Sequence, residues 1–289
     1  MEVAKSRLMQ DGAMLHYRLW QAGRTPQGLI VLLHGMASNL TRWSEFVERT
    51  ELKHHWDILR PDLRGHGASL VRGRIGAKIW SADLIELLDA EGCERAVIVG
   101  HSLGAHLALQ FAARFPERVR AVVLIDPAFP TSLRGYFRWL RPLRSVVAGL
   151  AALIRAVNAL GLRRRRFPQR DLKQWDEEVR RELLDNGQAG EFVRRYSSPT
   201  TDIKYFPVAH YLQELYEMLR PLPDLARLPV PTLVLLSRGV TFTDPAATAR
   251  LLAGLPHVES ITIDAYHWPL TEKPGEVRRA IEVWLNRLS

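Results

Sequence analysis

The chain has 289 residues, of which 47% are hydrophobic and 25% are charged. These fractions are typical of a globular protein and exclude a collagen-like, coiled-coil or wholly disordered chain. A single cysteine, Cys93, excludes an internal disulfide and a cysteine-based zinc site. The N-terminal stretch is not of signal-peptide type, and no run of about 18 uncharged apolar residues occurs, so we expect a cytoplasmic protein without a transmembrane helix.

Most of the excess positive charge falls in the middle of the chain. There are 40 Lys and Arg against 31 Asp and Glu, a net charge of +9, and the stretch from Pro130 to Pro223 holds 17 basic and 10 acidic residues. Such a segment can attract an anionic substrate, a membrane surface or nucleic acid, or can simply keep the protein soluble. Charge alone names no partner, so we favour solubility and expect no nucleic-acid binding.

The first third of the chain alternates strand and helix patterns. Short, β-branched apolar runs, such as the one that ends at His34-Gly35, suit strands covered on both faces. Segments with apolar residues at helical spacing separate these runs. The predicted strands span residues 14–20, 28–33, 56–60, 96–99 and 119–125, and the predicted helices span 43–52, 79–90 and 103–115.

The alternation breaks after Asp126-Pro127 and resumes near residue 230. No strand pattern occurs between residues 129 and 222, where helices are predicted at 146–160 and 176–186 beside an arginine run at 163–166. After that stretch, the pattern predicts strands at 232–236 and 260–263 and helices at 246–255 and 276–288.

Strands that alternate with helices indicate a mostly parallel, twisted sheet with helices on both faces. The break in the pattern indicates an insertion into that sheet. We therefore predict an α/β fold whose core is formed by residues 1–128 and 224–289. A helical cap, residues 129–223, is inserted after the strand that ends at Asp126.

A G-x-S-x-G pentapeptide, Gly100 to Gly104, stands between a predicted strand and a predicted helix. A serine on such a sharp turn projects from the sheet edge, and the glycines let neighbouring backbone approach. The helix that follows points its first amides at the same place, where they stabilise an anion. Ser102 is therefore the candidate nucleophile, although the pentapeptide also occurs by chance in ordinary turns.

His267 is the candidate base among the ten histidines. A serine hydroxyl is a weak nucleophile until a base removes its proton. His267 follows the last predicted strand, and the loops after parallel strands meet at one rim of the sheet, where Ser102 also lies. His34, His66 and His101 lie in glycine-containing turns, so we predict structural roles for them.

Two backbone amides are candidates for an oxyanion hole. Leu103 directly follows the nucleophile, and Met36 follows the His34-Gly35 pair at the end of another strand. Gly35 would let that loop approach closely. Donors at these two places would point at a negatively charged oxygen that forms on the substrate.

Six segments together resemble the α/β-hydrolase-fold serine hydrolases that carry a helical cap domain. They are VLLHGM (31–36), PDLRGHGAS (61–69), VGHSLG (99–104), VVLIDPA (122–128), VPTLVLL (230–236) and YHWP (266–269). They follow the family's order over nearly the whole chain, and only the predicted cap lacks a match. The resemblance implies Ser102 as nucleophile, His267 as base, and Met36 and Leu103 as the oxyanion hole, with no metal and no organic cofactor.

The triad acid is where the sequence departs from the family's commonest pattern. Many relatives carry an aspartate after the penultimate strand, and ungapped spacing places Val240 at that position. Asp126 follows the strand after the nucleophile's helix, a position that some relatives use. Asp244 would serve if the loop had a different shape. We favour Asp126 and keep Asp244 as the alternative, because without a carboxylate the imidazole tautomer is poorly fixed.

The predicted cap has two interpretations. Residues 143–162 are strongly apolar, which suits either a lid helix over the site or, with the arginine run, an interfacial helix at a membrane surface. We favour the lid, and a basic cap would also accept an anionic substrate. The candidate substrate-binding residues are Gly35, Trp175, Tyr205 and Trp268. The sequence gives no indication of the oligomeric state.

These residues predict a serine hydrolase that cleaves a carboxylic ester or lactone through a Ser102 acyl-enzyme. The same triad could instead hydrolyse a carbon–carbon bond or act as a lyase. Val240 in the acid position leaves a third alternative, a non-catalytic small-molecule-binding protein. Dehalogenases and epoxide hydrolases of this fold use aspartate at the elbow, so Ser102 disfavours both. No glycine-rich phosphate loop follows the first strand, which disfavours nucleotide binding.

Overall fold

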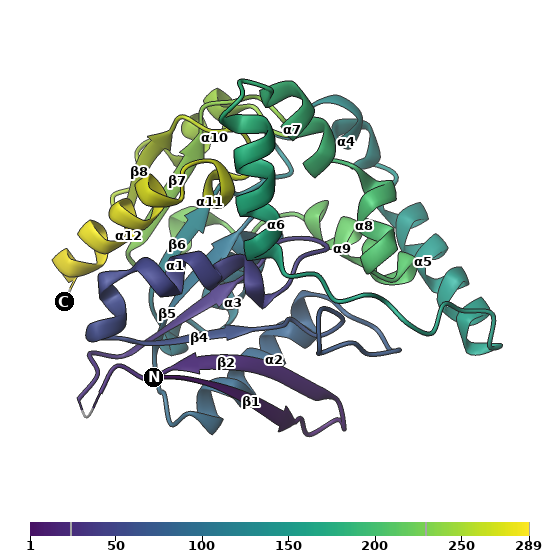
Figure 1. Ribbon diagram of the computed structural model, residues 1–289, viewed down its shortest axis with the longest axis horizontal. Coiled ribbons are helices and arrows are strands. Elements are labelled where there is room, and N and C mark those ends of the chain that lie inside the picture. Colours follow the sequence, from purple (N-terminus) through teal and green to yellow (C-terminus); the bar gives the residue numbers. More distant parts are fainter. Residues whose placement is uncertain (24, 229, 289) are drawn as a thin grey trace.

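The computed structural model describes residues 1–23, 25–228 and 230–288. Its strands form an eight-stranded sheet in the order β1-β2-β4-β3-β5-β6-β7-β8, with helices on both faces (Figure 1). The pairs β1–β2 and β2–β4 are antiparallel, whereas all pairs from β4 to β8 are parallel. The predicted mostly parallel α/β sheet is therefore confirmed.

The sequence predicts every strand of this sheet except β1. That strand mixes charged, polar and apolar residues at an exposed edge and has no continuous apolar run. The strands are β1 (Glu2–Leu8), β2 (Met14–Trp20), β3 (Leu29–Leu33), β4 (Asp57–Pro61), β5 (Ala96–His101), β6 (Val119–Ile125), β7 (Thr232–Ser237) and β8 (Val258–Ile263).

The central strands bury side chains on both faces of the sheet. In β3, Ile30 and Leu32 pack in one cluster with α1 and α12, while Val31 and Leu33 pack in another with α2 and α3. Because both faces are covered, these strands read as continuous apolar runs. The helices of this core are α1 (Ser44–Arg49), α2 (Ala77–Ala90), α3 (Leu103–Arg114), α10 (Pro245–Leu252), α11 (Pro269–Glu272) and α12 (Pro274–Leu288).

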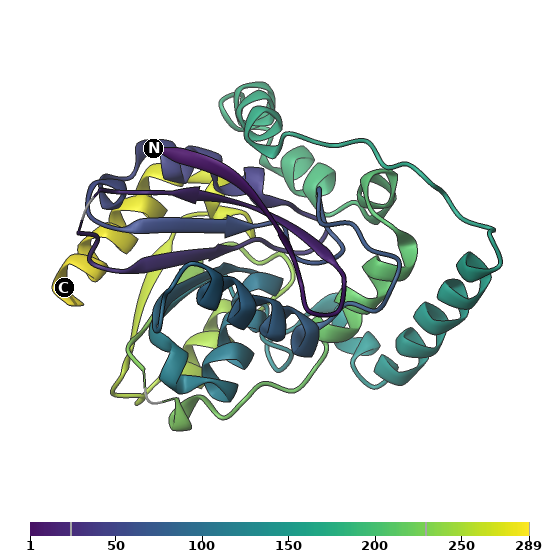
Figure 2. The same cartoon turned by 90° about the horizontal axis from the view of Figure 1, so that it is seen from below.

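Residues 129–223, between β6 and β7, form the inserted segment, whose helices lie beside one end of the sheet (Figure 1). The two helices that the sequence predicts there correspond to α5 and to α6 with a π-helical turn after it. The full set is α4 (Gly135–Leu140), α5 (Arg144–Ala159), α6 (Leu172–Val179), α7 (Ala189–Tyr196), α8 (Pro199–Tyr205) and α9 (Val208–Met218). Figure 2 places α5 at the periphery, far from α12. Within the described ranges, no helix is long and apolar enough to cross a membrane.

Candidate active site

Ser102 occupies a sharp turn between the end of β5 and the start of α3. Its backbone has φ 52° and ψ −115°, a conformation that is strained for a residue with a side chain. Its amide donates to the carbonyl of Ile125 in the neighbouring strand β6 over 3.0 Å. The turn is thus held to the sheet, and the Ser102 hydroxyl lies beyond the strand end.

Two glycines make this turn sterically possible. A Cβ atom on Gly104 would lie 2.3 Å from the carbonyl oxygen of Leu33, and a Cβ atom on Gly100 would lie 2.2 Å from the carbonyl oxygen of Gly104. Both contacts are with backbone, which cannot move aside as a flexible side chain can. The spacing of glycines around the serine therefore follows from the close approach of β3, β5 and α3.

His267 lies in the loop after β8 and joins two side chains that are distant in the sequence. Its Nε2 is 2.8 Å from Oγ of Ser102, and its Nδ1 is 2.5 Å from Oδ2 of Asp126. All three side chains are buried. The structure thus brings Ser102, His267 and Asp126 into one hydrogen-bonded chain.

Asp126 follows β6, the strand next to the one that carries Ser102. Its second carboxylate oxygen accepts a hydrogen bond from the amide of Ser237 over 3.2 Å, which fixes the plane of the carboxylate. The alternative acid, Asp244, is engaged elsewhere: its side chain accepts hydrogen bonds from the amides of Ala246 and Ala247 at the start of α10. Of the two candidate acids, the structure therefore places Asp126 against His267.

The loop after β7, where many relatives carry the acid, has a different role here. Val240 is 53% exposed. Two residues further on, the ring of Phe242 lies edge-on to the His267 imidazole, with 4.9 Å between the ring centroids. Trp268 also packs edge-on against Phe242 and His267. The loop therefore supplies an aromatic cover to the imidazole.

His101, inside the pentapeptide, holds the backbone of His267 in place through a hydrogen bond. Its Nε2 donates to the backbone carbonyl of His267 over 2.9 Å. Burial and the nearby His267 lower the pKa of His101 to about 3. The ring is therefore neutral at ordinary pH and acts as a hydrogen-bond donor, in keeping with the structural role predicted from its turn.

The loop that holds Met36 is fixed by a buried carboxylate that the sequence analysis did not identify. Ala37 has φ 48°, and its amide donates to Oε2 of Glu214 over 3.1 Å. The other oxygen of Glu214 accepts from Nε2 of His66 over 2.5 Å. Glu214 lies on α9, so the inserted segment reaches under the candidate oxyanion loop. The sequence carries no local signal for this role, because Glu214 reads as one of several polar residues of a helix.

A cavity of about 390 Å³ opens at Ser102 and His267. Gly35, Met36 and Trp268 line it, as predicted, whereas Trp175 and Tyr205 are absent from its described lining. Their rings instead flank the guanidinium of Arg170, 3.5 and 4.7 Å from its central carbon. The wall also includes Ser38, Arg42, Arg134, Phe137, Tyr196, Ser197, Pro199, Asp202, Tyr211, Met218, Thr241 and Phe242.

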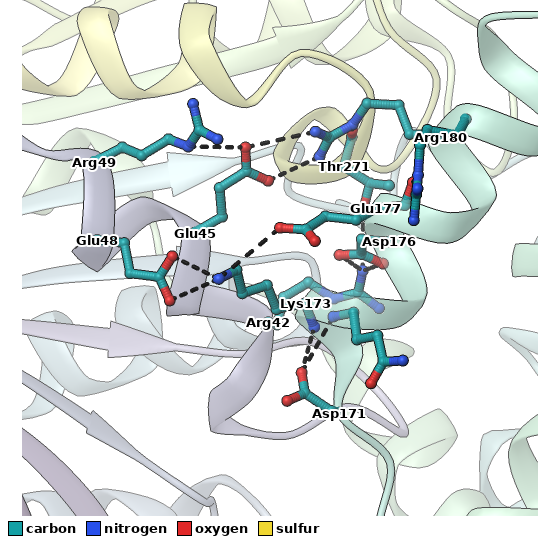
Figure 3. Close-up of polar contacts among 12 residues, drawn as sticks. Arg42, Glu45, Glu48, Arg49, Asp171, Lys173, Asp176, Glu177, Arg180 and Thr271 are labelled. Atoms are coloured by element: carbon teal, nitrogen blue, oxygen red, sulfur yellow. Dashed lines mark hydrogen bonds and ion pairs between the residues drawn. The ribbon is translucent and has the colours of Figure 1, made fainter.

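Beside the cavity, a polar contact joins the core to the inserted segment through Arg42, which lines the cavity (Figure 3). The buried guanidinium of Arg42 pairs with Asp176 on α6 and donates to the hydroxyl of Thr271 over 3.0 Å. Tyr196 donates to the same Asp176 over 2.6 Å. We call residues 171–218, which carry these contacts, the clamped part of the inserted segment.

Asp202 is an acidic group with an unusual pKa in the same cavity. Burial, followed by repulsion from Glu214, raises its pKa to about 7, although Arg170 and Arg42 act in the opposite direction. The carboxyl group therefore changes charge near neutral pH. In the described ranges, no three His, Cys, Asp or Glu side chains are grouped as metal ligands would be.

Comparison with known proteins supports the same assignment of the fold. A putative esterase/lipase of Haemophilus influenzae is 23% identical over 279 residues, covering 95% of this chain and 89% of that protein. A 2-hydroxy-6-oxo-2,4-heptadienoate hydrolase of Pseudomonas putida is 38% identical over 99 residues, 33% of this chain and 36% of that protein. The crystal structure of an enol-lactonase from Burkholderia xenovorans LB400 superposes with a TM-score of 0.66 at 22% identity, covering 98% and 100% of the two chains.

The match to a protein family covers most of the chain. Residues 30–280 match the profile of the Alpha/beta hydrolase family, from β3 through α12. This range includes the serine turn, the loop after β6 and the histidine loop. The protein is thus a member of the alpha/beta hydrolase family.

Proposed function

We propose that the protein is a serine hydrolase that cleaves a carboxylic ester or a lactone through an acyl-enzyme at Ser102. The observation that carries the proposal is the hydrogen-bonded chain of Ser102, His267 and Asp126, with distances of 2.8 and 2.5 Å. The family membership and the alignment with a putative esterase/lipase support this class of reaction.

In this mechanism Nε2 of His267 accepts the proton of the Ser102 hydroxyl as its oxygen attacks the substrate carbonyl. Asp126 accepts the hydrogen bond from Nδ1 and stabilises the imidazolium. The amides of Met36 and Leu103 would donate to the oxyanion of the tetrahedral intermediate. His267 then protonates the leaving alkoxide, and a water that His267 deprotonates releases the acid from Ser102.

The cavity is consistent with a small or medium-sized substrate. Its volume is about 390 Å³, within the range of small-molecule sites. Its lining combines the aromatic rings of Phe242 and Trp268 with hydroxyl groups and the ionisable side chains of Arg42 and Asp202. A lactone and an open-chain ester would pass through the same intermediate, because they differ only in whether the leaving alkoxide stays attached.

Labelling with a fluorophosphonate probe and hydrolysis of p-nitrophenyl butyrate test the proposal together. We expect the wild type to be labelled and to turn over, and Ser102→Ala to lose the label and roughly 10³-fold or more of the turnover. Ser132→Ala is the control, because the buried Ser132 hydroxyl donates to the carbonyl of Phe129 over 3.0 Å and Ser132 is absent from the described lining of the Ser102 cavity. Labelling that survives in Ser102→Ala would contradict the mechanism.

The acid assignment has its own test. Asp126→Asn should lower kcat by about 10⁴-fold, because the amide favours the wrong imidazole tautomer. Asp244→Asn should leave kcat near the wild-type value, because Asp244 caps α10. If only the Asp244 variant lost turnover, Asp126 would not be the acid.

A carbon–carbon bond hydrolase is a second candidate. The 38% identical match to a dienoate hydrolase favours it, as does Arg134 in the cavity wall, which forms no ion pair with a described residue and could bind a substrate carboxylate. Comparing kcat/KM for p-nitrophenyl butyrate and for a vinylogous diketone acid separates the two candidates. Tight ligand binding without any turnover would instead favour the non-catalytic alternative.

A further inference from the structure

Helix α5 carries an exposed stripe of large apolar residues. They recur at alternating intervals of three and four, which places them on one face of the helix. Their exposed fractions range from 39% to 82%, and Trp139, at the end of α4, is 77% exposed beside them. The members of this stripe are Leu143, Val146, Leu150, Leu153, Val157 and Leu160.

The stripe is separate from the face by which α5 is held to the protein. Val147 and Ala151 are buried where α5 packs against α9. The stripe residues lie on the adjacent face, and α5 itself lies at the edge of the molecule (Figure 2). A contiguous apolar surface of this kind indicates an interaction site rather than scattered surface residues.

The charged residues in the sequence around the stripe are all positive. We call residues 129–170 the arginine-rich part of the inserted segment, because it holds ten arginines and no lysine, aspartate or glutamate. The rest of the chain is nearly neutral, with 30 basic and 31 acidic residues. None of the ten arginines forms an ion pair with a described residue.

Several of these guanidinium groups gather around one hollow. A cavity of about 930 Å³ lies between α5, the chain after it and the start of α9. Arg155, Arg163, Arg164 and Arg165 line it, together with Arg72 from the core. Apolar side chains of Leu162 and Phe167, among others, complete the wall. The hollow thus combines positive charge, which suits a lipid phosphate, with apolar surface, which suits an acyl chain.

We propose that the arginine-rich part docks the protein on an anionic lipid bilayer, with α5 lying in the plane of the interface. The stripe would enter the boundary between headgroups and acyl chains, and the arginines would contact lipid phosphates. A second copy of the chain is a poor occupant of this face, because two sets of ten positive charges would meet without any carboxylate. Arg134 and Gly135 also line the Ser102 cavity, so docking holds that cavity near the bilayer.

Vesicle flotation with the full-length chain tests the proposal. We expect at least tenfold more protein on vesicles of 70% phosphatidylcholine and 30% phosphatidylglycerol than on pure phosphatidylcholine vesicles. Raising the salt from 50 to 500 mM should release most of it, because salt screens exposed charges. Equal binding to the two vesicle types would overturn the proposal.

Two variants and their controls assign the binding to this surface. Leu150→Gln with Leu153→Gln should weaken binding at least fivefold, whereas Leu8→Gln with Val283→Gln, apolar residues elsewhere that are at least as exposed, should not. Circular dichroism checks that each variant is folded. Equal losses in the two pairs would overturn the proposal.

The arginines are tested in the same way. Replacing Arg163, Arg164, Arg165 and Arg166 by glutamine should weaken binding at least tenfold. Replacing the exposed Arg7, Arg114, Arg250 and Arg279 removes the same charge from other surfaces and should change it less than twofold. Sedimentation velocity tests whether a second copy of the chain occupies this face instead. The proposal would be overturned if the wild type self-associated but did not bind vesicles, and if the Leu150/Leu153 variant no longer self-associated. Ester hydrolysis by Ser102 is measured separately and does not depend on this result.

Discussion

The two parts of the inserted segment differ in whether their cationic side chains form ion pairs. In the clamped part, cations on α6 and the turn after it pair with carboxylates on α1, Arg180 with Glu45 at 2.8 Å and Lys173 with Glu48 at 2.6 Å (Figure 3). In the arginine-rich part, ten arginines have no carboxylate partner among the described residues. Cationic side chains thus join the clamped part to the core, whereas those of the arginine-rich part remain available to an external anion.

Apolar packing differs between the two parts as well. Phe192 and Tyr196 of the clamped part pack with Trp268 of the core, with 5.7 and 5.3 Å between ring centroids. Along α5, by contrast, only Val147 and Ala151 are buried. The clamped part therefore packs against the core and shapes the cavity. In α5, by contrast, most of the apolar surface is exposed and makes no packing contribution to stability.

The largest expected effect comes from removing the buried ion pair between Arg42 and Asp176. Asp176→Asn should lower the free energy of unfolding by about 3–5 kcal/mol, because it leaves the buried guanidinium of Arg42 without a counter-ion. Urea denaturation followed by fluorescence measures the change. Asp185→Asn is the control, since Asp185 is exposed on the same part of the chain. If both variants lowered the free energy of unfolding by the same amount, the Arg42–Asp176 pair would not hold the inserted segment to the core.

A pH-dependent effect of intermediate size is expected at Asp202, a carboxyl group in the clamped part that no ion pair within the described ranges engages. Its folded-state pKa, about 7, lies above the ordinary value of 3.8, so the folded protein favours the protonated form. That contribution to stability is present in full below about pH 4 and is lost as the pH rises through 7.

Asp202→Asn should therefore gain stability relative to the wild type as the pH rises from 4 to 8, by roughly 1–3 kcal/mol at pH 8. Urea denaturation at several pH values measures this difference. The difference between Asp185→Asn and the wild type should stay constant over the same range. A pH-independent difference for Asp202→Asn would mean that Asp202 has an ordinary pKa.

A smaller effect is expected at the solvent-facing end of the clamp. Lys173 is paired with Glu48, but their side chains are 29% and 53% exposed. Exposed ion pairs contribute at most about 1 kcal/mol. Lys173→Gln should therefore lower the free energy of unfolding by less than about 1 kcal/mol, and 0.5 M salt should remove most of that difference. A loss as large as that of Asp176→Asn would show that exposure is a poor guide to the strength of this clamp.

Local patterns predict the sheet and most of the candidate site. Apolar residues fill most of β3, β5, β6 and β7. The turn at Ser102 and the loop at His267 follow strand ends, so their meeting at one rim follows from parallel topology. β1 is missed because an exposed edge strand needs no apolar run. Asp126 and Asp244 could not be separated with certainty, because the choice depends on the shape of a loop.

Contacts between distant segments leave no local pattern. Arg42 and Asp176 are 134 positions apart, and Glu214 reaches Ala37 across 177 positions. Each residue reads as an ordinary surface charge of a helix or turn. The positions of Trp175 and Tyr205 are a related case: aromatic residues mark a packed region, but only the packing around Arg170 decides whether they face the cavity.

The smallest expected effect is the most informative about α5. A buried leucine replaced by a polar residue costs several kcal/mol, but an exposed one changes stability by about 0.5 kcal/mol or less. Leu150→Gln with Leu153→Gln should therefore leave the free energy of unfolding within about 1 kcal/mol of the wild-type value. Val147→Gln, one face away on the same helix, should cost about 2 kcal/mol or more, because Val147 is buried against α9. Both changes fall in the same helix and add the same amide, so the ratio of their costs measures how much of α5 the rest of the chain covers. Equal costs would mean that the stripe is buried in solution, and neither a lipid surface nor any other partner would then have access to it.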